Sequence, residues 1–306
     1  MTIEMDLLKQ LCSIHAPSGN EGEMKEFIKN YIKQNQKNWK SVPEIIEGDF
    51  MQDCLLVKFG KPTTVIFAHM DSIGFTVRYK NEVVKIGGPA TDSGIKLVGK
   101  DSIGEINCTL KEERNSLMVK FNREIERGTE LVFEPNWREN DEFIQCCYMD
   151  NRLGIWNALK VAETLENGVI AFSCWEEHGG GSVDYLAEYM YKNWGVRQAL
   201  ISDITWVTDG VPHGKGVVIS MRDRGIPRRS FIDKIIAMAK ESTIPFQLEV
   251  EGAGSSDGGY LQSGHLPFDW CFIGAPEDHV HSPDEKVHKN DVDAMWRMYE
   301  YLMKRL

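Results

Sequence analysis

The sequence predicts an α/β protein whose main domain is interrupted by a small all-β module. Short apolar runs alternate with helical patterns over most of the chain, as expected of a sheet covered by helices. Between residues 76 and 142 the texture changes to short alternating segments, among them TVRYK, VVKIG, LMVKF and ELVFE. The helix-and-strand pattern then resumes. We therefore expect a discontinuous main domain, 1–75 with 143–306, and an insertion at 76–142.

The elements of the main domain follow from their apolar spacing. A helix is expected after the Pro17-Ser18-Gly19 turn, because apolar residues recur there at intervals of three and four. Continuous apolar runs are typical of strands covered on both faces. Such runs occur near 54–59, 63–68, 168–175, 198–202 and 269–274. A helical pattern at 155–165 separates two of them, and a last helix is expected at 292–302.

Composition and charge exclude several classes of protein. The 306 residues are 42% hydrophobic and 26% charged, which is ordinary for a globular chain. A net charge of -11 disfavours nucleic acid as a partner. The longest apolar stretches are far shorter than the roughly 20 residues of a membrane span, and the first residues lack the pattern of a secretory signal. Seven cysteines, an odd number without CxxC spacing, fit a reduced, cytoplasmic setting.

Polar side chains able to bind metal ions follow several of the predicted strands. In open α/β sheets, functional groups gather beyond the carboxyl ends of the strands. Five strand ends carry such groups: His69 with Asp71, Asp150, Glu176 with Glu177, Asp203, and His279 with His281. We therefore expect these side chains to meet at one edge of the sheet.

Imidazole and carboxylate ligands together suit zinc, cobalt or manganese ions. Two divalent ions held roughly 3.5 to 4 Å apart would lower the pKa of a bound water and make it a nucleophile. One histidine and one carboxylate for each ion, with one shared aspartate, would complete the set: His69 with Asp203, Glu177 with His279 or His281, and Asp150 between them.

Two further carboxylates have different expected roles. Glu176 is expected to act as general base, accepting a proton from the water and passing it to a leaving amine. Asp71, two residues after His69 on the same strand face, is placed to accept the other N–H of that imidazole. Taken singly, such residues are more often helix caps, acidic turns or core histidines. The combination at five strand ends is what favours a metal centre.

Seven segments, taken in order, resemble a known family. They are APSGNEG, AHMDSIGF, MDNRLG, WEEHGGGS, ISDIT, GSSDGG and HSPDE, and they span nearly the whole chain. Together they resemble the dinuclear metallo-aminopeptidases that include the tetrahedral, glutamyl and deblocking aminopeptidases. The resemblance implies a mixed-sheet, zinc-peptidase-like catalytic domain with helices on both faces, interrupted by an inserted β-barrel. It also implies removal of N-terminal residues from short peptides with two divalent ions per subunit, zinc before cobalt or manganese.

The resemblance also assigns roles to single positions. Its metal ligands fall on His69, Asp150, Glu177, Asp203 and His281, so His281 is selected over His279. Its general base falls on Glu176, its orienting aspartate on Asp71, and its substrate-side loop on the segment that contains Asp257. Ser72 departs from the family, which usually has Glu there. A homo-oligomer is implied, and it can be smaller than the tetrahedral dodecamer because the chain is shorter than many relatives.

Alternative functions stay open on the sequence alone. Related two-metal sites cleave other amides, so a dinuclear deacylase or carboxypeptidase is one alternative. A catalytically silent metal-binding protein of the same fold is another, although every proposed ligand and the base are present. A glycosidase that pairs Glu176 with Glu177 is disfavoured, because successive strand residues point to opposite faces.

Overall fold

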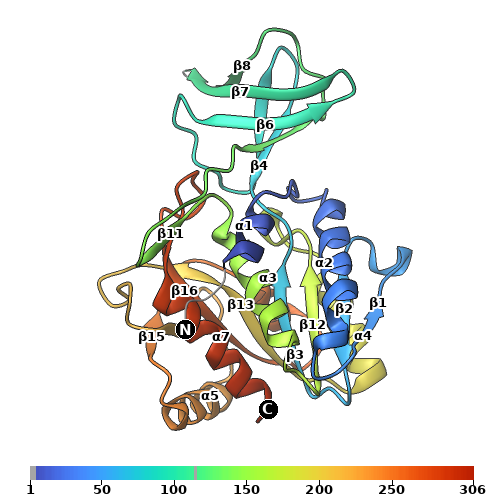
Figure 1. Ribbon diagram of the computed structural model, residues 1–306, viewed down its shortest axis with the longest axis vertical. Helices are drawn as coiled ribbons and strands as arrows, with labels where there is room; N and C mark the ends of the chain where they lie inside the picture. Colours follow the sequence, from blue (N-terminus) through green and yellow to red (C-terminus); the bar gives the residue numbers. More distant parts are fainter. Residues whose placement is uncertain (1–4, 114–115) are drawn as a thin grey trace.

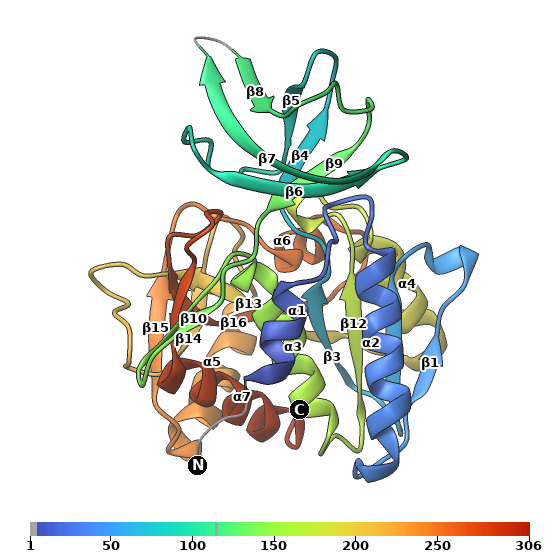
Figure 2. The ribbon, with the colours of Figure 1, turned by 45° about the horizontal axis from the view of Figure 1, so that its top comes forward.

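The computed structural model describes residues 5–113 and 116–306. Figures 1 and 2 show a large α/β domain with a small β domain standing at one end of it. The large domain is built on an eleven-stranded sheet with the order β1-β2-β12-β3-β13-β16-β17-β11-β10, to which β14 and β15 attach beside β16. The small domain is a closed barrel of six strands. The predicted α/β fold with an inserted β-barrel is therefore confirmed.

The sheet is mixed, with parallel strands at its centre. Neighbours β12, β3, β13 and β16 run parallel, while β2, β14 and β17 pair antiparallel with the edges of this group. The attached pair of β14 and β15 is parallel. Every residue of β3 and β12 is buried, as expected for apolar strands covered on both faces. The strands are β1 (Glu44–Ile46), β2 (Leu55–Phe59), β3 (Thr64–His69), β10 (Arg138–Glu139), β11 (Phe143–Gln145), β12 (Gly168–Ser173), β13 (Gln198–Trp206), β14 (Val217–Arg222), β15 (Phe246–Val250), β16 (Asp269–Asp278) and β17 (Lys286–His288).

Helices cover both faces of this sheet. In Figure 1 α3 and α7 lie in front of it, and α4 lies behind. Helix α2 packs through an apolar stripe, in which Met24, Ile28 and Ile32 are buried at a spacing of four residues. Helix α3 is instead buried on nearly all sides. The helices are α1 (Asp6–Cys12), α2 (Gly22–Asn35), α3 (Met149–Ala162), α4 (Val183–Trp194), α5 (Arg229–Ser242), α6 (Asp257–Ser263) and α7 (Lys289–Met303). None of the helices within the described ranges has the length and hydrophobicity that a membrane crossing requires.

The barrel leaves the main domain directly after β3. Its strands are β4 (Gly74–Val77), β5 (Glu82–Ile86), β6 (Lys96–Asp101), β7 (Gly104–Glu113), β8 (Ser116–Lys120) and β9 (Glu130–Phe133). Alternate residues of β7, namely Ile106, Cys108 and Leu110, point into the barrel core. Because β4 begins at Gly74, the barrel starts slightly before residue 76, and the domain boundaries stay a prediction. The loop after β5 returns to the main domain, where Ala90 N donates to His281 O over 2.9 Å.

Candidate metal centre

Two neighbouring parallel strands bring the first predicted ligands together. His69 is the last residue of β3, and Asp203 lies within the adjacent β13. Ile201 pairs with Phe67, so continuing the register by two residues places Asp203 beside His69. His69 Nε2 lies 3.7 Å from Asp203 Oδ2. Both side chains are almost fully buried, at 2% and 5% exposure.

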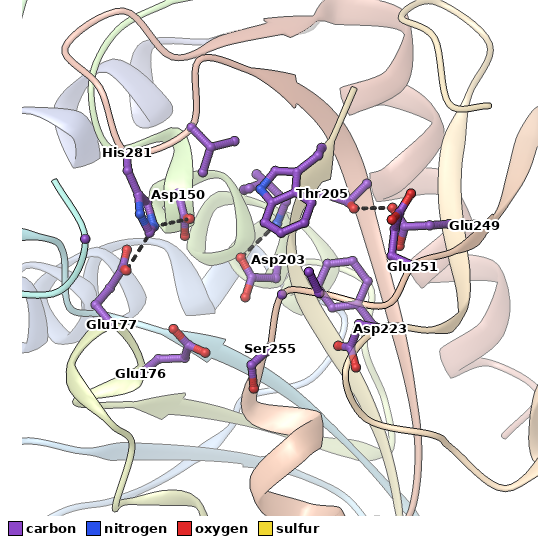
Figure 3. Close-up of a pocket in the computed structure, with 17 residues that line it drawn as sticks. Asp150, Glu176, Glu177, Asp203, Thr205, Asp223, Glu249, Glu251, Ser255 and His281 are labelled. Carbon is purple, nitrogen blue, oxygen red and sulfur yellow. Dashed lines mark hydrogen bonds and ion pairs between the residues drawn. The ribbon is translucent and has the colours of Figure 1, made fainter. Parts of the chain in front are cut away.

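Asp150 lies between the two predicted histidine ligands. Its Oδ1 is 3.2 Å from His69 Nε2, and its Oδ2 is 3.4 Å from His281 Nε2. His281 Nε2 in turn lies 3.1 Å from Glu177 Oε2. Ligand atoms of His69, Asp150 and Glu177 all lie within 4.8 Å of one another. Figure 3 shows Asp150, Glu177 and His281 converging on one side of a pocket.

Three of the predicted strand ends differ from the sequence prediction in the secondary structure on which their side chains lie. Asp203 does not end its strand, because β13 continues to Trp206 through pairing with β16. Asp150 lies in the first turn of α3 and not directly after a strand. Glu176 and Glu177 belong to a short 3-10 helix, Glu176–His178, which follows a left-handed turn at Trp175 with φ 62°. The sequence argument against a glycosidase assumed that Glu176 and Glu177 are successive residues of a strand. That assumption was wrong, because both lie in the short helix.

Asp71 connects several parts of the centre through one buried carboxylate. It is 0% exposed and accepts hydrogen bonds from Ser18 Oγ at 2.6 Å and from the backbone N–H of Glu176 and of Glu177, each at 3.1 Å. Its Oδ1 also lies 3.3 Å from His69 Nδ1. Asp71 thus fixes the position of the turn that carries Glu176 and Glu177 relative to His69.

Glu285 performs a similar task on the other side, and sequence reasoning assigned it no role. It is fully buried and accepts the backbone N–H of Asp150 at 3.2 Å and of His281 at 3.0 Å. The signal available in the sequence was its place in HSPDE, four residues after His281. Two segments far apart in the chain are therefore joined through one carboxylate.

The charges of the centre strongly perturb one another. Burial opposes protonation of His69, but the charge of Asp203 and hydrogen bonds to Asp150 and Asp71 raise its pKa well above the usual value. Burial also raises the pKa of Glu177 and of Asp203, and the nearby charge of Asp150 adds to both shifts. The pKa of Asp150 is lowered, because contacts with His281 and His69 outweigh its burial. These carboxylates crowd a space where added positive charge would be stabilising.

This donor set fits divalent cations. The centre offers two imidazoles and three carboxylates, a mixture that zinc, cobalt and manganese accept. One carboxylate oxygen, Glu177 Oε1, is buried and has no hydrogen-bond partner among the described residues. A buried acceptor without a donor is costly unless something positive occupies the space before it.

Glu176 lines the same pocket as Glu177 and His281. Figure 3 shows its carboxylate directed into the pocket, away from Glu177. Burial raises its pKa well above the usual value; the charge of His69 lowers it, while that of Glu177 raises it further. A carboxylate with a raised pKa is a stronger proton acceptor, which suits the role of a general base.

Asp257, which the resemblance places on the substrate side, and Ser72, where the family usually has Glu, are not among the residues that line the pocket. Asp257 begins α6, is 2% exposed, and accepts a hydrogen bond from Ser173 Oγ. Ser255, two residues earlier, does line the pocket. Ser72 is also buried, and its hydroxyl donates to Ala16 O at 3.2 Å.

The pocket has a volume of about 380 Å³ and extends beyond the metal-ligand candidates. Its farther wall contains three carboxylates that the sequence analysis did not single out: Asp223, Glu249 and Glu251. The pocket lining also includes the apolar side chains of Trp206 and Phe272. A group bound at the metal centre would therefore have room for a side chain next to it.

Known proteins share this sequence pattern and this architecture. A family model described as M42 glutamyl aminopeptidase matches residues 111–298. A protein of Acetivibrio thermocellus that carries a provisional aminopeptidase name is 26% identical over 330 aligned positions, with 94% of each chain covered.

Two solved structures illustrate the likeness in fold. The TET1 peptidase of Pyrococcus horikoshii, which can assemble into a tetrahedron or a large octahedral shell, superposes with a TM-score of 0.83 at 21% identity, over 99% of both chains. An aminopeptidase from the archaeon Desulfurococcus kamchatkensis gives a TM-score of 0.86 at 20% identity, over 99% of this chain and 94% of that one. At such identities the likeness shows the fold alone.

Proposed function

Since the chain belongs to the M42 glutamyl aminopeptidase family and is thus a peptidase hydrolase, we propose that it removes N-terminal residues from short peptides in a metal-dependent reaction. The observation that carries the metal dependence is the position of Asp150 between His69 and His281. Each histidine also has a second carboxylate beside it, Asp203 or Glu177. One shared and two separate carboxylates make a ligand set for a pair of ions.

The proposed ligands divide into two groups. His69 and Asp203 would hold one ion, His281 and Glu177 the other, and Asp150 would be shared. We propose zinc ahead of cobalt or manganese, since imidazole and carboxylate ligands are common at zinc sites. When bound, such ions supply Lewis acidity toward the scissile carbonyl and toward a water molecule.

The side chains of the protein perform the proton transfers in this proposal. As the water oxygen bonds to the carbonyl carbon, the carboxylate of Glu176 accepts the proton that the water loses. When the C–N bond breaks, Glu176 returns that proton to the departing amine nitrogen. Asp71 holds His69 in the tautomer that leaves Nε2 directed toward Asp150 and Asp203. The negative charge of the pocket carboxylates would also favour binding of the free α-ammonium group of the substrate.

The proposal also includes a cytoplasmic location and a homo-oligomeric state. All seven cysteines are free and buried, which supports a reduced, cytoplasmic location. A homo-oligomer is proposed because the TET1 peptidase with the same fold forms closed shells and its chain is covered over 99% of its length.

A comparison of blocked and unblocked substrates tests the proposed function. Chelator-treated protein should be inactive toward aminoacyl anilides, and added zinc, cobalt or manganese should restore hydrolysis. N-acetylated anilides should resist cleavage, because the free α-amine is lost. Hydrolysis of the N-acetylated compounds alone would support a deacylase and contradict an aminopeptidase. Full activity after chelation would contradict the proposed metal dependence.

A further inference from the structure

The carboxylates of Asp223, Glu249 and Glu251 form a wall of the pocket on the side away from Glu177 and His281. Figure 3 shows Asp203 lying between the two groups. We call the three residues the acidic wall. Strands β14 and β15 run parallel, and Asp223 and Glu251 directly follow their last residues. The same end of this strand pair therefore presents both side chains.

Glu249 is a buried acidic residue in a strand whose adjacent apolar side chains are exposed. Its neighbours in β15, Leu248 and Val250, are 43% and 65% exposed, whereas Glu249 is only 2% exposed. The strand thus turns apolar side chains outward and a carboxylate inward, the reverse of what folding stability favours. Such an inversion is expected where an inward charge serves binding more than folding stability.

Within the part of the chain that the structure describes, no ion pair neutralises the acidic wall. Among the described residues, no Lys or Arg lines the pocket, and no cation lies within ion-pair distance of the three carboxylates. Glu249 accepts a hydrogen bond from Thr205 Oγ1, and Asp223 accepts one from the backbone N–H of Gly225. Arg222 lies nearby, but its Nε donates to the backbone oxygen of Asp223 at 3.1 Å. Burial raises the pKa of Glu249, and the charges of Glu251 and Asp223 raise it further. A bound cation would relieve this repulsion.

The rest of this region is apolar. Trp206 is 39% exposed, and its ring lies against the backbone of Gly254, where an added Cβ would come within 3.3 Å of the indole. Phe272 is largely buried and lines the same space. An aliphatic stem could therefore lie along aromatic surface while its charged end meets carboxylates, and an aromatic face also attracts a cation.

We infer that the acidic wall binds the cationic side chain of the N-terminal residue, so that the enzyme prefers peptides beginning with lysine or arginine. This inference rests on the proposed function for its description of the substrate, but the binding itself is testable without turnover. It differs from what the description of the family as glutamyl aminopeptidases suggests, because a glutamate side chain would place a fourth negative charge against three others.

Matched ligands separate the contribution of the side-chain charge to binding from that of the aliphatic stem. Titration calorimetry on the zinc-loaded, full-length protein should show that lysinamide binds about tenfold or more tightly than norleucinamide, which has a similar stem without the ammonium group. Glutamic acid amide should bind more weakly than either. Equal binding of lysinamide and norleucinamide, or tighter binding of glutamic acid amide, would overturn the inference.

Substitutions test whether the preference for a cationic side chain depends on the acidic wall. Glu251→Gln should lower the ratio of kcat/KM for lysyl over norleucyl anilide by about tenfold, mainly through KM. Glu251→Arg should raise the relative rate with glutamyl anilide. The surface variant Asp233→Asn on α5 should leave the ratio unchanged. A fall in bound zinc in Glu251→Gln would show that the wall holds a metal ion, which contradicts the inference.

The two proposals fail in different ways. If lysinamide is preferred but no anilide is hydrolysed, the acidic wall stands and the proposed aminopeptidase reaction fails. If leucyl or glutamyl anilide is hydrolysed best and lysinamide has no binding advantage, the reaction stands and the inference fails.

Discussion

Nδ1 of His69 lies 3.3 Å from Oδ1 of Asp71, so the ring of one proposed ligand faces a carboxylate that is itself inaccessible to solvent. The same carboxylate accepts the backbone N–H groups of the turn that carries Glu176 and Glu177. A proposed ligand on β3 and a turn after β12 are thereby held in one geometry.

Asp71→Asn should weaken metal binding without abolishing it. The amide cannot both accept from the backbone and keep the charge that orients His69, and losses of this kind cost about 10-fold to 100-fold in metal affinity or activity. Competition with a zinc-binding dye measures the affinity, with exposed Asp209→Asn as the control. An unchanged affinity and unchanged kcat/KM would show that Asp71 does not orient the ligand.

Glu176→Gln should separate metal binding from catalysis. The amide keeps the shape of the side chain but cannot accept the proton of the water, and general-base catalysis contributes about 10²-fold to 10⁴-fold. We expect kcat to fall by that factor while zinc content stays at the wild-type value. Glu188→Gln on α4, where the side chain is 37% exposed, is the control. Turnover close to that of the wild type would remove Glu176 from the mechanism.

His281 and His279 provide a matched pair of substitutions. Both have left-handed backbone angles, φ 64° and 61°, so replacement by Ala carries a similar backbone cost. His281→Ala should lose bound zinc and activity, because His281 Nε2 lies beside both Glu177 and Asp150. His279→Ala should keep both, since His279 is exposed. Elemental analysis with kcat/KM checks this, and the reverse result would assign the ligand to His279.

Glu21 should make the stability of the metal-free protein depend on pH. Burial raises its pKa from 4.5 to about 7, and its Oε2 has no hydrogen-bond partner within the described residues. Between these values the folded state holds a proton that the unfolded state releases, so stability falls as pH rises through this window. The difference amounts to roughly 3 kcal/mol.

Replacing Glu21 by Gln tests that relation. Relative to Glu21→Gln, the wild-type free energy of unfolding should fall by roughly 3 kcal/mol between pH 4.5 and 7.5 in urea titrations of chelator-treated protein. Curves that stay parallel across this range would show that Glu21 is ionised in the folded state.

Much of the fold and of the metal centre was predictable because it follows from local pattern. Continuous apolar runs identified β3 and β12, and the parallel order of such strands places their ends together. The gathering of His69, Asp150 and His281 follows from this rule, although Asp150 is delivered by the start of α3. The substitutions above test the residue assignments.

The acidic wall was not predictable in the same way. Asp223, Glu249 and Glu251 are ordinary acidic residues in the sequence, and their convergence depends on the pairing of β14 with β15, which no local pattern specifies. The one available sign was in FQLEV, where a glutamate stands between two apolar residues. Reading that alternation correctly requires knowing which face of the strand is buried.

Anomalous diffraction at the zinc edge, from crystals grown with zinc, tests the central claim most directly. The account predicts two peaks, one at about 2 Å from ligand atoms of His69 and Asp203 and one at that distance from His281 and Glu177, with Asp150 reaching both. Strong zinc peaks elsewhere on the protein, with none between His69 and His281, would contradict it.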